Sequence, residues 1–272
     1  MQAPAIWRPP TGTLGQIVGE ARVRVAELKI RQAELERAAA DAGPTDHSFR
    51  DALRRSTVAV IAEVKRKSPS KGWIAEGLTA VGQAHAYADG GAAAISVLTE
   101  PAHFNGSIED LDAVIEDVDL PVLKKDFHID EVQLLEARAH RANAALLIVR
   151  ALGPSVAPLI RKAKEIGLET LVEIRDEDEL RLALDAGAEI IGVNNRDLET
   201  LVIDPTTSER LLPKIPASVI AIAESGMSTV LDIERAAGLG ADAVLVGSSL
   251  SGSEDPEGAV RTLASVPRID RG

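Results

Sequence analysis

Along most of the chain, short runs of apolar residues alternate with segments in which apolar residues recur at helical spacing. Eight short apolar runs recur at fairly even intervals and are predicted to be strands, at residues 58–64, 92–98, 120–125, 144–149, 168–174, 189–194, 218–224 and 242–247. The segments between them, such as EVQLLEARAH and EDELRLALDA, carry apolar residues at helical spacing. Strands that alternate with helices in this way favour parallel pairing with right-handed crossovers.

Eight strand–helix units predict an α/β fold of the (β/α)8, or TIM-barrel, type. Each run is apolar on both faces, as a parallel strand needs to be because helices cover the sheet. Such a barrel typically has about 250 residues, close to the 272 of this chain. A doubly wound open sheet is the second interpretation, and it usually has fewer strands.

Before the first strand the pattern is helical only. Apolar residues recur at helical spacing from Leu14 to about Ala40, DAGPTD interrupts the pattern, and SFRDALRR predicts a second short helix. We therefore expect residues 1–55 to form a helical extension packed on a barrel of residues 56–272, within one structural domain.

Small residues punctuate the ends of several predicted helices. Gly91, Asn143, Gly187 and Gly240 stand just before the second, fourth, sixth and eighth strands, and each fits a left-handed residue after a helix. GLGADA, which contains the last of them, resembles a dinucleotide fingerprint. It closes a helix and precedes a strand, the reverse of the required order, so nucleotide binding is not expected.

Composition narrows the classes of function. The net charge of −12 argues against nucleic acid as the main partner, because phosphate backbones need a basic face. The absence of cysteine excludes disulfides and thiolate metal sites. No stretch approaches the ~20 apolar residues of a membrane span, and the N-terminus lacks the pattern of a signal peptide. We expect a soluble cytoplasmic protein, as a monomer or a weak homodimer.

Candidate catalytic groups stand at the carboxyl ends of the predicted strands, which meet at one rim of a barrel. They are Glu63 and Lys65 after the first strand, Lys125 after the third, Glu173 after the fifth, Asn194 after the sixth and Glu224 after the seventh. An unpaired charge beside an apolar run is costly, so we expect the charged members to face a shared pocket.

Other polar residues near the rim are expected to be solvated. Lys124, Arg66 and Lys67 fall in this group, because charges at strand ends are usually exposed. The five histidines show no metal-ligand spacing, so no metal is expected, and His128 is expected at the surface.

Two loops predict an anion site. AESGM follows the seventh strand and LVGSSL the eighth, and in barrels these two loops often hold a phosphate. Gly226 and Gly247 would let the backbone approach an anion, and Ser248 adds a hydroxyl donor. Plain turns are the alternative for each loop alone. Together they predict a phosphorylated small-molecule substrate.

A series of motifs runs along nearly the whole chain. AEVKRKSPSKG is followed by SVLTEPAHFNGS, LPVLKKDF, LLIVR, LVEIRDEDEL, IGVNNRDLETL, AESGM and VGSSL. In residues and order these motifs resemble the indole-3-glycerol phosphate synthase family of tryptophan biosynthesis. The resemblance implies a carboxy-lyase without cofactor, which converts 1-(2-carboxyphenylamino)-1-deoxyribulose 5-phosphate to indole-3-glycerol phosphate with loss of CO2 and H2O.

The resemblance also implies a role for each residue at the rim. Lys125 would be the general acid of ring closure, and Glu173 would act as acid and base in dehydration. Lys65 would pair with the substrate carboxylate, oriented by Glu63. Asn194 would bind a hydroxyl or the developing charge, supported by Glu224. Substrate would be bound by Ser68, Gly226, Gly247, Ser248 and Ser225 around phosphate, by Phe104, Phe127, Leu146 and Leu198 around the aromatic ring, and by Arg196, which braces the site.

Three alternatives stay open at this stage. The motif LPVLKKDF contains two lysines, and a shift of one residue in strand register would exchange Lys124 and Lys125. A phosphoribosylanthranilate isomerase-like barrel is another enzyme of this type, but that family relies on a cysteine base. A non-catalytic barrel that binds a phosphorylated metabolite would not need the whole set of rim charges. Trp7 could contact ligand or serve packing.

Overall fold

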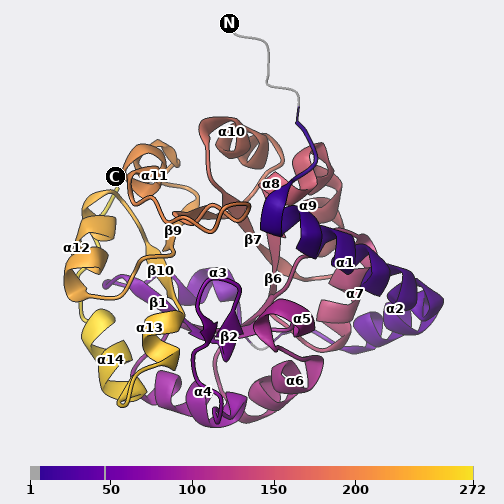
Figure 1. Cartoon of the computed structure of the whole chain (residues 1–272), viewed down its shortest axis with the longest axis horizontal. Helices are drawn as coiled ribbons and strands as arrows, with labels where there is room; N and C mark the ends of the chain where they lie inside the picture. The colour runs from indigo at the N-terminus through magenta and orange to yellow at the C-terminus, as the bar shows by residue number, and fades with distance from the viewer. Residues whose placement is uncertain (1–6, 46, 272) are drawn as a thin grey trace, which may run out of the picture.

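The computed structural model describes residues 7–45 and 47–271 of the chain. Eight parallel strands close into a barrel in the order β1-β10-β9-β8-β7-β6-β5-β4, with helices around the outside (Figure 1). The barrel strands are β1 (Ala59–Val64), β4 (Ala94–Leu98), β5 (Val122–Lys125), β6 (Ala144–Ile148), β7 (Glu169–Ile174), β8 (Ile190–Asn194), β9 (Ile220–Glu224) and β10 (Ala243–Val246). All eight predicted runs are barrel strands, which confirms the predicted TIM barrel.

Helices connect successive strands and cover the outside of the barrel. They are α4 (Ala80–Asp89), α5 (Pro101–Phe104), α6 (Ile108–Asp117), α7 (Glu131–Ala139), α8 (Val149–Leu152), α9 (Val156–Glu165), α10 (Glu177–Asp185), α11 (Thr206–Leu211), α12 (Val230–Gly238), α13 (Ser248–Ser251) and α14 (Pro256–Leu263), with 3-10 turns η1 (Gly153–Ser155) and η2 (Leu212–Lys214). A short antiparallel hairpin of β2 (Lys67–Ser68) and β3 (Gly72–Trp73) follows β1.

Strand alternation divides the buried side chains into two layers. Val60 and Ala62 of β1 belong to a cluster packed between the strands and the surrounding helices. Ile61, between them, belongs to a second cluster inside the barrel, together with Leu123 of β5 and Leu171 of β7. Because successive side chains on a strand point to opposite faces, polar residues two positions beyond these inner residues also face the barrel axis.

The N-terminal extension covers both ends of this inner cluster. It consists of α1 (Gly12–Ile30), α2 (Gln32–Asp41) and α3 (Phe49–Ala52). Leu14 and Ile17 of α1 join the inner cluster at the carboxyl ends of the strands, and Figure 1 shows α1 starting at this side of the barrel near α8 and running outward to α2. Phe49 of α3 joins it at the opposite end, beside Glu169 at the start of β7.

The single helix predicted from Leu14 to Ala40 is two helices in the structure. Arg31 leaves the helical conformation with φ −104° and ψ 12°, so the chain turns between α1 and α2. The turn lets Leu35 and Ala39 of α2 pack against Val132 and Leu135 of α7, outside the barrel. Burial of these apolar side chains accounts for the break.

Three of the four predicted left-handed residues are confirmed. Gly91, Gly187 and Gly240 have φ values of 90°, 81° and 93°. The prediction for Asn143 is wrong, because the left-handed residue after α7 is Arg141, with φ 60°, which precedes β6 by three residues as the glycines precede their strands. The Asn143 side chain instead accepts a hydrogen bond from the Val122 N–H at the start of β5.

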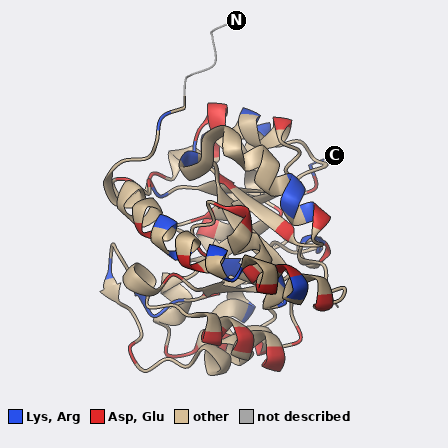
Figure 2. Ribbon diagram, turned by 90° about the vertical axis from the view of Figure 1, so that its right-hand side faces the viewer, with Lys and Arg blue, Asp and Glu red and all other residues tan. Residues whose placement is uncertain are grey.

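The distribution of surface charge and the character of the helices indicate which partners the protein can bind. On the side shown in Figure 2, acidic and basic residues are interspersed over the helices. Within residues 7–45 and 47–271, no helix combines the length and the apolar character that a bilayer crossing requires.

Candidate active site

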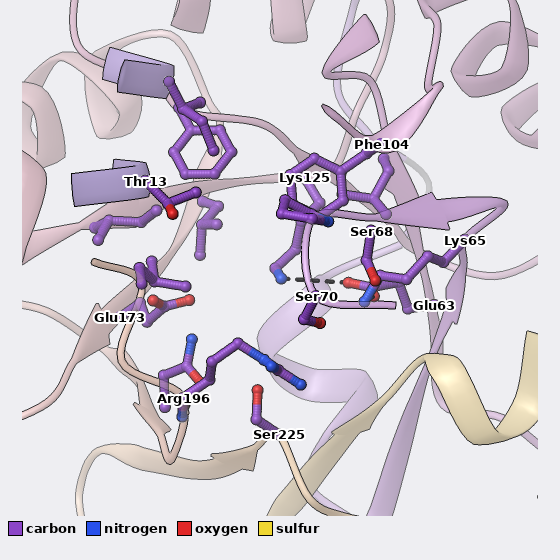
Figure 3. Close-up of a pocket in the computed structure, with 18 of the residues that line it drawn as sticks. Thr13, Glu63, Lys65, Ser68, Ser70, Phe104, Lys125, Glu173, Arg196 and Ser225 are labelled. Carbon is purple, nitrogen blue, oxygen red and sulfur yellow. Dashed lines mark hydrogen bonds and ion pairs between the residues drawn. The ribbon is translucent and has the colours of Figure 1, made fainter. Parts of the chain in front are cut away.

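Polar side chains from five strands lie at the carboxyl end of the barrel, and Figure 3 shows three of them, Glu63, Lys125 and Glu173, around one cavity. Glu63, Lys125, Glu173, Asn194 and Glu224 end β1, β5, β7, β8 and β9, each at an inward-facing position of its strand. The three glutamates and Asn194 are almost completely buried, and the Lys125 side chain is 16% exposed. Five of the six predicted catalytic residues, namely Glu63, Lys65, Lys125, Glu173 and Asn194, line one cavity at this rim, whereas Glu224 is not among its lining residues.

Glu63 lies between two ammonium groups. Lys125 Nζ is 3.2 Å from Glu63 Oε2, and Lys65 pairs with the other carboxylate oxygen. Burial by itself would raise the pKa of Glu63, but the charges of Lys125 and Lys65 outweigh it and bring the pKa to about 2. Burial likewise opposes the charged form of Lys125, but nearby carboxylates, Glu63 foremost, hold its pKa above the usual value. At neutral pH both groups are ionised.

Glu173 and Glu224 form a second, proton-sharing pair. Burial raises the pKa of both carboxyls, and for Glu224 burial and then the charge of Glu173 bring the pKa to about 8. The charge of an ionised Glu173 disfavours a second negative charge beside it, so one proton stays on the pair at neutral pH. Lys125 Nζ, 4.0 Å from Glu224 Oε2, links this pair to Glu63. The rim thus holds proton donors and acceptors side by side.

Two glycines make room for these carboxylates. A Cβ on Gly192, in β8, would collide with Glu224 Oε1. A Cβ on Gly247, directly after β10, would collide with Glu63 Oε1 and lie 3.2 Å from Lys65 Nζ. Side chains at either position would displace the charged groups from the rim.

The carboxyl end of the barrel is hollowed into a cavity with an apolar side. Among the predicted residues, Phe104, Phe127, Leu146 and Leu198 line it. The rings of Phe104 and Phe127 lie 6.1 Å apart between centroids and are tilted by 36°. Such a wall suits a flat aromatic ligand.

Hydroxyl groups line the other side. Ser68, Ser225 and Ser248 face the cavity, as does Arg196, whose guanidinium donates to the Leu201 carbonyl. Gly226 and Gly247 belong to the same loops but are not among the lining residues. Ser225 has φ 63° and is followed by Gly226 with φ 82°, so this loop turns sharply at the rim.

Several lining residues were not predicted from the sequence. They are Thr13, Ile17, Pro69, Ser70, Leu98, Asp126, Ile148 and Leu201. Thr13 and Ile17 come from α1, whose place over the barrel is decided by tertiary packing. Pro69 and Ser70 stand within the motif AEVKRKSPSKG, which could have indicated them.

The structure corrects the expectation of solvated charges for two of three residues. Lys124 is fully buried, with Nζ 3.0 Å from Glu136 Oε2, because alternation turns it outward against α7. Arg66 forms an ion pair with Asp110 that is mostly buried. Lys67 is partly exposed, and its Nζ lies 6.0 Å from the ring centroid of Trp73. Lys125, not Lys124, faces the cavity, which resolves the question of register.

His128 is buried inside the protein, whereas Trp7 packs on its surface. The prediction of a surface position for His128 is wrong, since it is 2% exposed and its Nδ1 is 2.8 Å from the Leu146 carbonyl. Burial, and then the charge of Lys124, lower the pKa of His128 to about 3. Trp7 donates from its indole N–H to the Arg150 carbonyl and covers Gly153, where a Cβ would strike the ring.

One group within the described ranges has the spacing for a metal ion, namely Glu20, Glu100 and His103. Its donor atoms already have partners. Glu100 caps α5 by accepting from three backbone N–H groups and also pairs with Arg24 at 3.0 Å. His103 Nε2 is 2.7 Å from Glu20. These contacts join α1 to the start of α5, so the cluster has a structural role.

Fold and site together define the class: this is a (β/α)8-barrel with a Lys/Glu acid–base set beside an aromatic cavity at the carboxyl ends of its strands. A family model described as "Indole-3-glycerol phosphate synthase" matches residues 14–263. The chain belongs to the indole-3-glycerol phosphate synthase family, the carboxy-lyases of tryptophan biosynthesis.

Similar proteins agree with this assignment. "Indole-3-glycerol phosphate synthase 1" of Streptomyces coelicolor is 49% identical over 255 residues, which cover 93% of this chain and 94% of that protein. "Indole-3-glycerol phosphate synthase" of Mycolicibacterium vanbaalenii is 51% identical over 215 residues, or 79% of each chain.

Solved structures share the fold at low identity. 3-hexulose-6-phosphate synthase from Salmonella typhimurium has a TM-score of 0.62 at 19% identity and covers 76% of this chain and 97% of its own. Thiamine phosphate pyrophosphorylase from Pyrococcus furiosus has a TM-score of 0.57 at 17% identity, with coverage of 78% and 95%. At these identities the likeness concerns the barrel alone.

Proposed function

We propose that this chain acts as an indole-3-glycerol phosphate synthase through the acid–base set at its barrel rim. The substrate would be 1-(2-carboxyphenylamino)-1-deoxyribulose 5-phosphate, and the products indole-3-glycerol phosphate, CO2 and H2O. The observation that carries the mechanism is the contact of Lys125 with Glu63 at 3.2 Å, beside the proton-sharing pair of Glu173 and Glu224.

Lys125 is the proposed general acid of ring closure. Attack of the aromatic carbon on the substrate carbonyl makes an alkoxide, which is a stronger base than an amine. Lys125 is protonated at neutral pH because carboxylates surround it, so it can both stabilise this negative charge and give it a proton. Lys65 pairs with the substrate carboxylate, and Glu63 holds the two ammonium groups in place.

Dehydration needs a base for one proton and an acid for the leaving hydroxyl. Glu173, with its raised pKa and its partner Glu224, can supply both functions in turn. Asn194 is placed to bind a substrate hydroxyl, and its contact with Glu173 favours the ionised form of that carboxyl.

Binding groups on both sides would hold the substrate for ring closure. Phe104, Phe127, Leu146 and Leu198 would enclose the aromatic ring. The phosphate would bind at the other side, near the lining residues Ser68, Arg196, Ser225 and Ser248 and the adjoining Gly226 and Gly247. Anchoring both ends of a flexible chain turns ring closure into a step between prepositioned atoms.

A Lys125 series tests the role of this residue. We expect Lys125→Ala to lower kcat by at least about 10²-fold, as loss of a general acid does. Lys125→Arg keeps the charge beside Glu63 but releases its proton poorly, and we expect it to be nearly as inactive. Product is followed by indole fluorescence, with Lys164→Ala, an exposed lysine far from the rim, as control. Wild-type activity in Lys125→Ala would refute the assignment, and an inactive wild type would favour a barrel that only binds a metabolite.

We also propose that the protein works in the cytoplasm as a monomer or a weak homodimer. The large exposed apolar side chains of the described residues come from separate parts of the sequence, among them Val23 and Ile30 of α1, Val202 and Leu231. Sedimentation of the whole chain at micromolar concentration would reveal a stable larger assembly.

A further inference from the structure

The overall reaction takes up one proton, and the buried groups of the rim cannot supply it for more than one turnover. If the proposed function holds, on which this inference rests, the substrate carboxylate leaves as neutral CO2, so each turnover consumes one proton from solvent. The acid–base groups are buried, and a substrate that fills the cavity covers them from the mouth side. A replacement proton must therefore reach these groups by a route other than the mouth of the substrate cavity.

A side cavity adjoins the rim among the loops that follow β6, β7 and β8. Its volume is about 390 Å³, and it shares Ile148, Glu173, Arg196 and Leu198 with the substrate cavity. Most of its remaining lining is charged, with residues from β7, α8, α10, α11 and the segment after β8. A polar cavity of this size holds several water molecules. Glu173 thus faces both the substrate cavity and an aqueous one.

A third, outer pocket adjoins this side cavity. It is formed between the N-terminal segment and α10, and Trp7, 37% exposed, is part of its edge. Three residues line both this outer pocket and the side cavity, namely Arg150, Asp176 and Glu179. A relay between the two spaces would have to pass through one of them.

Glu179 is the member of this group suited to carry a proton. One carboxylate oxygen accepts the Arg175 N–H at 2.7 Å. Burial, and then the charge of Asp176, raise the pKa of Glu179 to about 8, so it holds a proton at neutral pH and can release it. Arg150 donates to the Arg8 carbonyl at 2.7 Å and pairs with Glu199 at 3.0 Å, so its guanidinium serves these contacts. The Asp176 side chain accepts the Glu179 N–H, which caps α10.

The charges around Glu179 come from every neighbouring element. They are Arg8 of the N-terminal segment, Arg150 of α8, Glu173 of β7, Arg175 and Asp176 after it, Asp178, Arg181 and Asp185 of α10, Arg196, Asp197, Glu199 and Asp204 after β8, and Arg210 of α11. Several arginines in this set have carboxylate partners, such as Arg175 with Asp197 at 2.9 Å and Arg150 with Glu199 at 3.0 Å.

We propose that Glu179 is a proton relay that connects solvent in the outer pocket with Glu173 through the side cavity. Glu179 donates its carboxyl proton to cavity water, which passes a proton to the Glu173 carboxylate. Glu179, now ionised, takes a replacement from solvent in the outer pocket. No bond other than O–H is made or broken, and one proton enters per turnover. Glu179 does not touch substrate. It acts through Glu173, to which it delivers protons, and is therefore not a catalytic residue itself.

Glu179→Gln tests the relay, because Gln keeps the acceptor for the Arg175 N–H but does not titrate. We expect kcat to fall about tenfold at pH 8 in a bulky buffer, with KM within twofold of wild type. A small buffer acid such as imidazole should enter the side cavity and restore kcat in proportion to its concentration. Wild type should show no such dependence. Glu179→Asp, which keeps a titratable group, should recover part of the loss without imidazole.

A neighbouring glutamate provides the matched control. Glu177 stands on the same helix, lines neither cavity and pairs with Arg210 and Lys214 on the surface, so Glu177→Gln should behave as wild type. An unchanged kcat in Glu179→Gln at every pH and buffer would overturn the relay. So would a loss that imidazole leaves unaltered, which would mean a structural role. An active wild type in the same assays keeps the proposed function intact in both cases, whereas an inactive one overturns it and the relay together.

Discussion

At the scale of single residues, the rim keeps five ionisable groups close together by dividing them into two unlike sets. Glu63 is stabilised as an anion by Lys65 and Lys125, whereas Glu224 and Glu173 share a proton. The difference comes from neighbours, since all three carboxyls are similarly buried. Burial favours the neutral form of an acid, and only adjacent ammonium groups reverse this preference.

The proton held by Glu224 predicts a stability that depends on pH. Its folded-state pKa, about 8, lies above the ~4.3 of an unfolded glutamate. The wild type therefore loses stability as the pH rises from about 4 to about 8. Glu224→Gln cannot ionise, and we expect it to be more stable than wild type at pH 8 by up to a few kcal/mol, with the difference vanishing near pH 4. Urea unfolding at both pH values measures this, and an equal difference at the two would contradict it.

At the scale of elements, charge holds α1 against the barrel at the point where catalysis is proposed. Arg24 donates to Glu100 at 3.0 Å and to Asp126 at 2.7 Å. Glu100 begins α5, and Asp126 directly follows Lys125 at the end of β5. One guanidinium thus joins the extension to two loops of the rim.

Removing this guanidinium should weaken the attachment of α1. We expect Arg24→Met to lower the free energy of unfolding by about 3 kcal/mol, because both carboxylates are buried and would each lose a charged partner. Arg22→Met, which changes an exposed arginine two residues earlier on the same helix, is the control and should stay within about 0.5 kcal/mol of wild type. Chemical denaturation gives both values. Equal stability of the two variants would show that apolar contacts alone dock the helix.

At the scale of the whole molecule, the extension and the barrel share one core. Leu14 and Ile17 of α1 and Phe49 of α3 belong to the same buried cluster as the inner side chains of the strands. Neither part can bury these residues without the other. We therefore propose that residues 1–55 and 56–272 form one structural domain, with the extension packed on the barrel.

This proposal predicts coincident unfolding of the two parts. The chain has two tryptophans, and Trp73→Phe leaves Trp7 as the sole reporter, on the N-terminal segment. We expect its fluorescence and the far-UV circular dichroism of the helices to change at the same temperature, as in a single cooperative transition. A Trp7 transition well below the main one would indicate that the segment detaches first.

Much of this architecture could be predicted from the sequence. Each barrel strand appears as an apolar run, and each proposed catalytic group stands at the end of such a run, where a parallel barrel brings strand ends together. The wrong predictions of solvent exposure concern residues whose neighbours come from segments far away in the sequence. Lys124 and His128 are polar residues at a strand end, and only the packing of α7 and β6 against β5 explains why both are buried.

The sequence by itself determined the strands, the order of elements and the residue types of the rim, because alternation and helical spacing are local properties of the chain. The tertiary structure decided which carboxyls are ionised, where α1 lies over the barrel, and that a side cavity reaches Glu173. These features depend on contacts between segments far apart in sequence, and electrostatic and packing energies are set by distance in space.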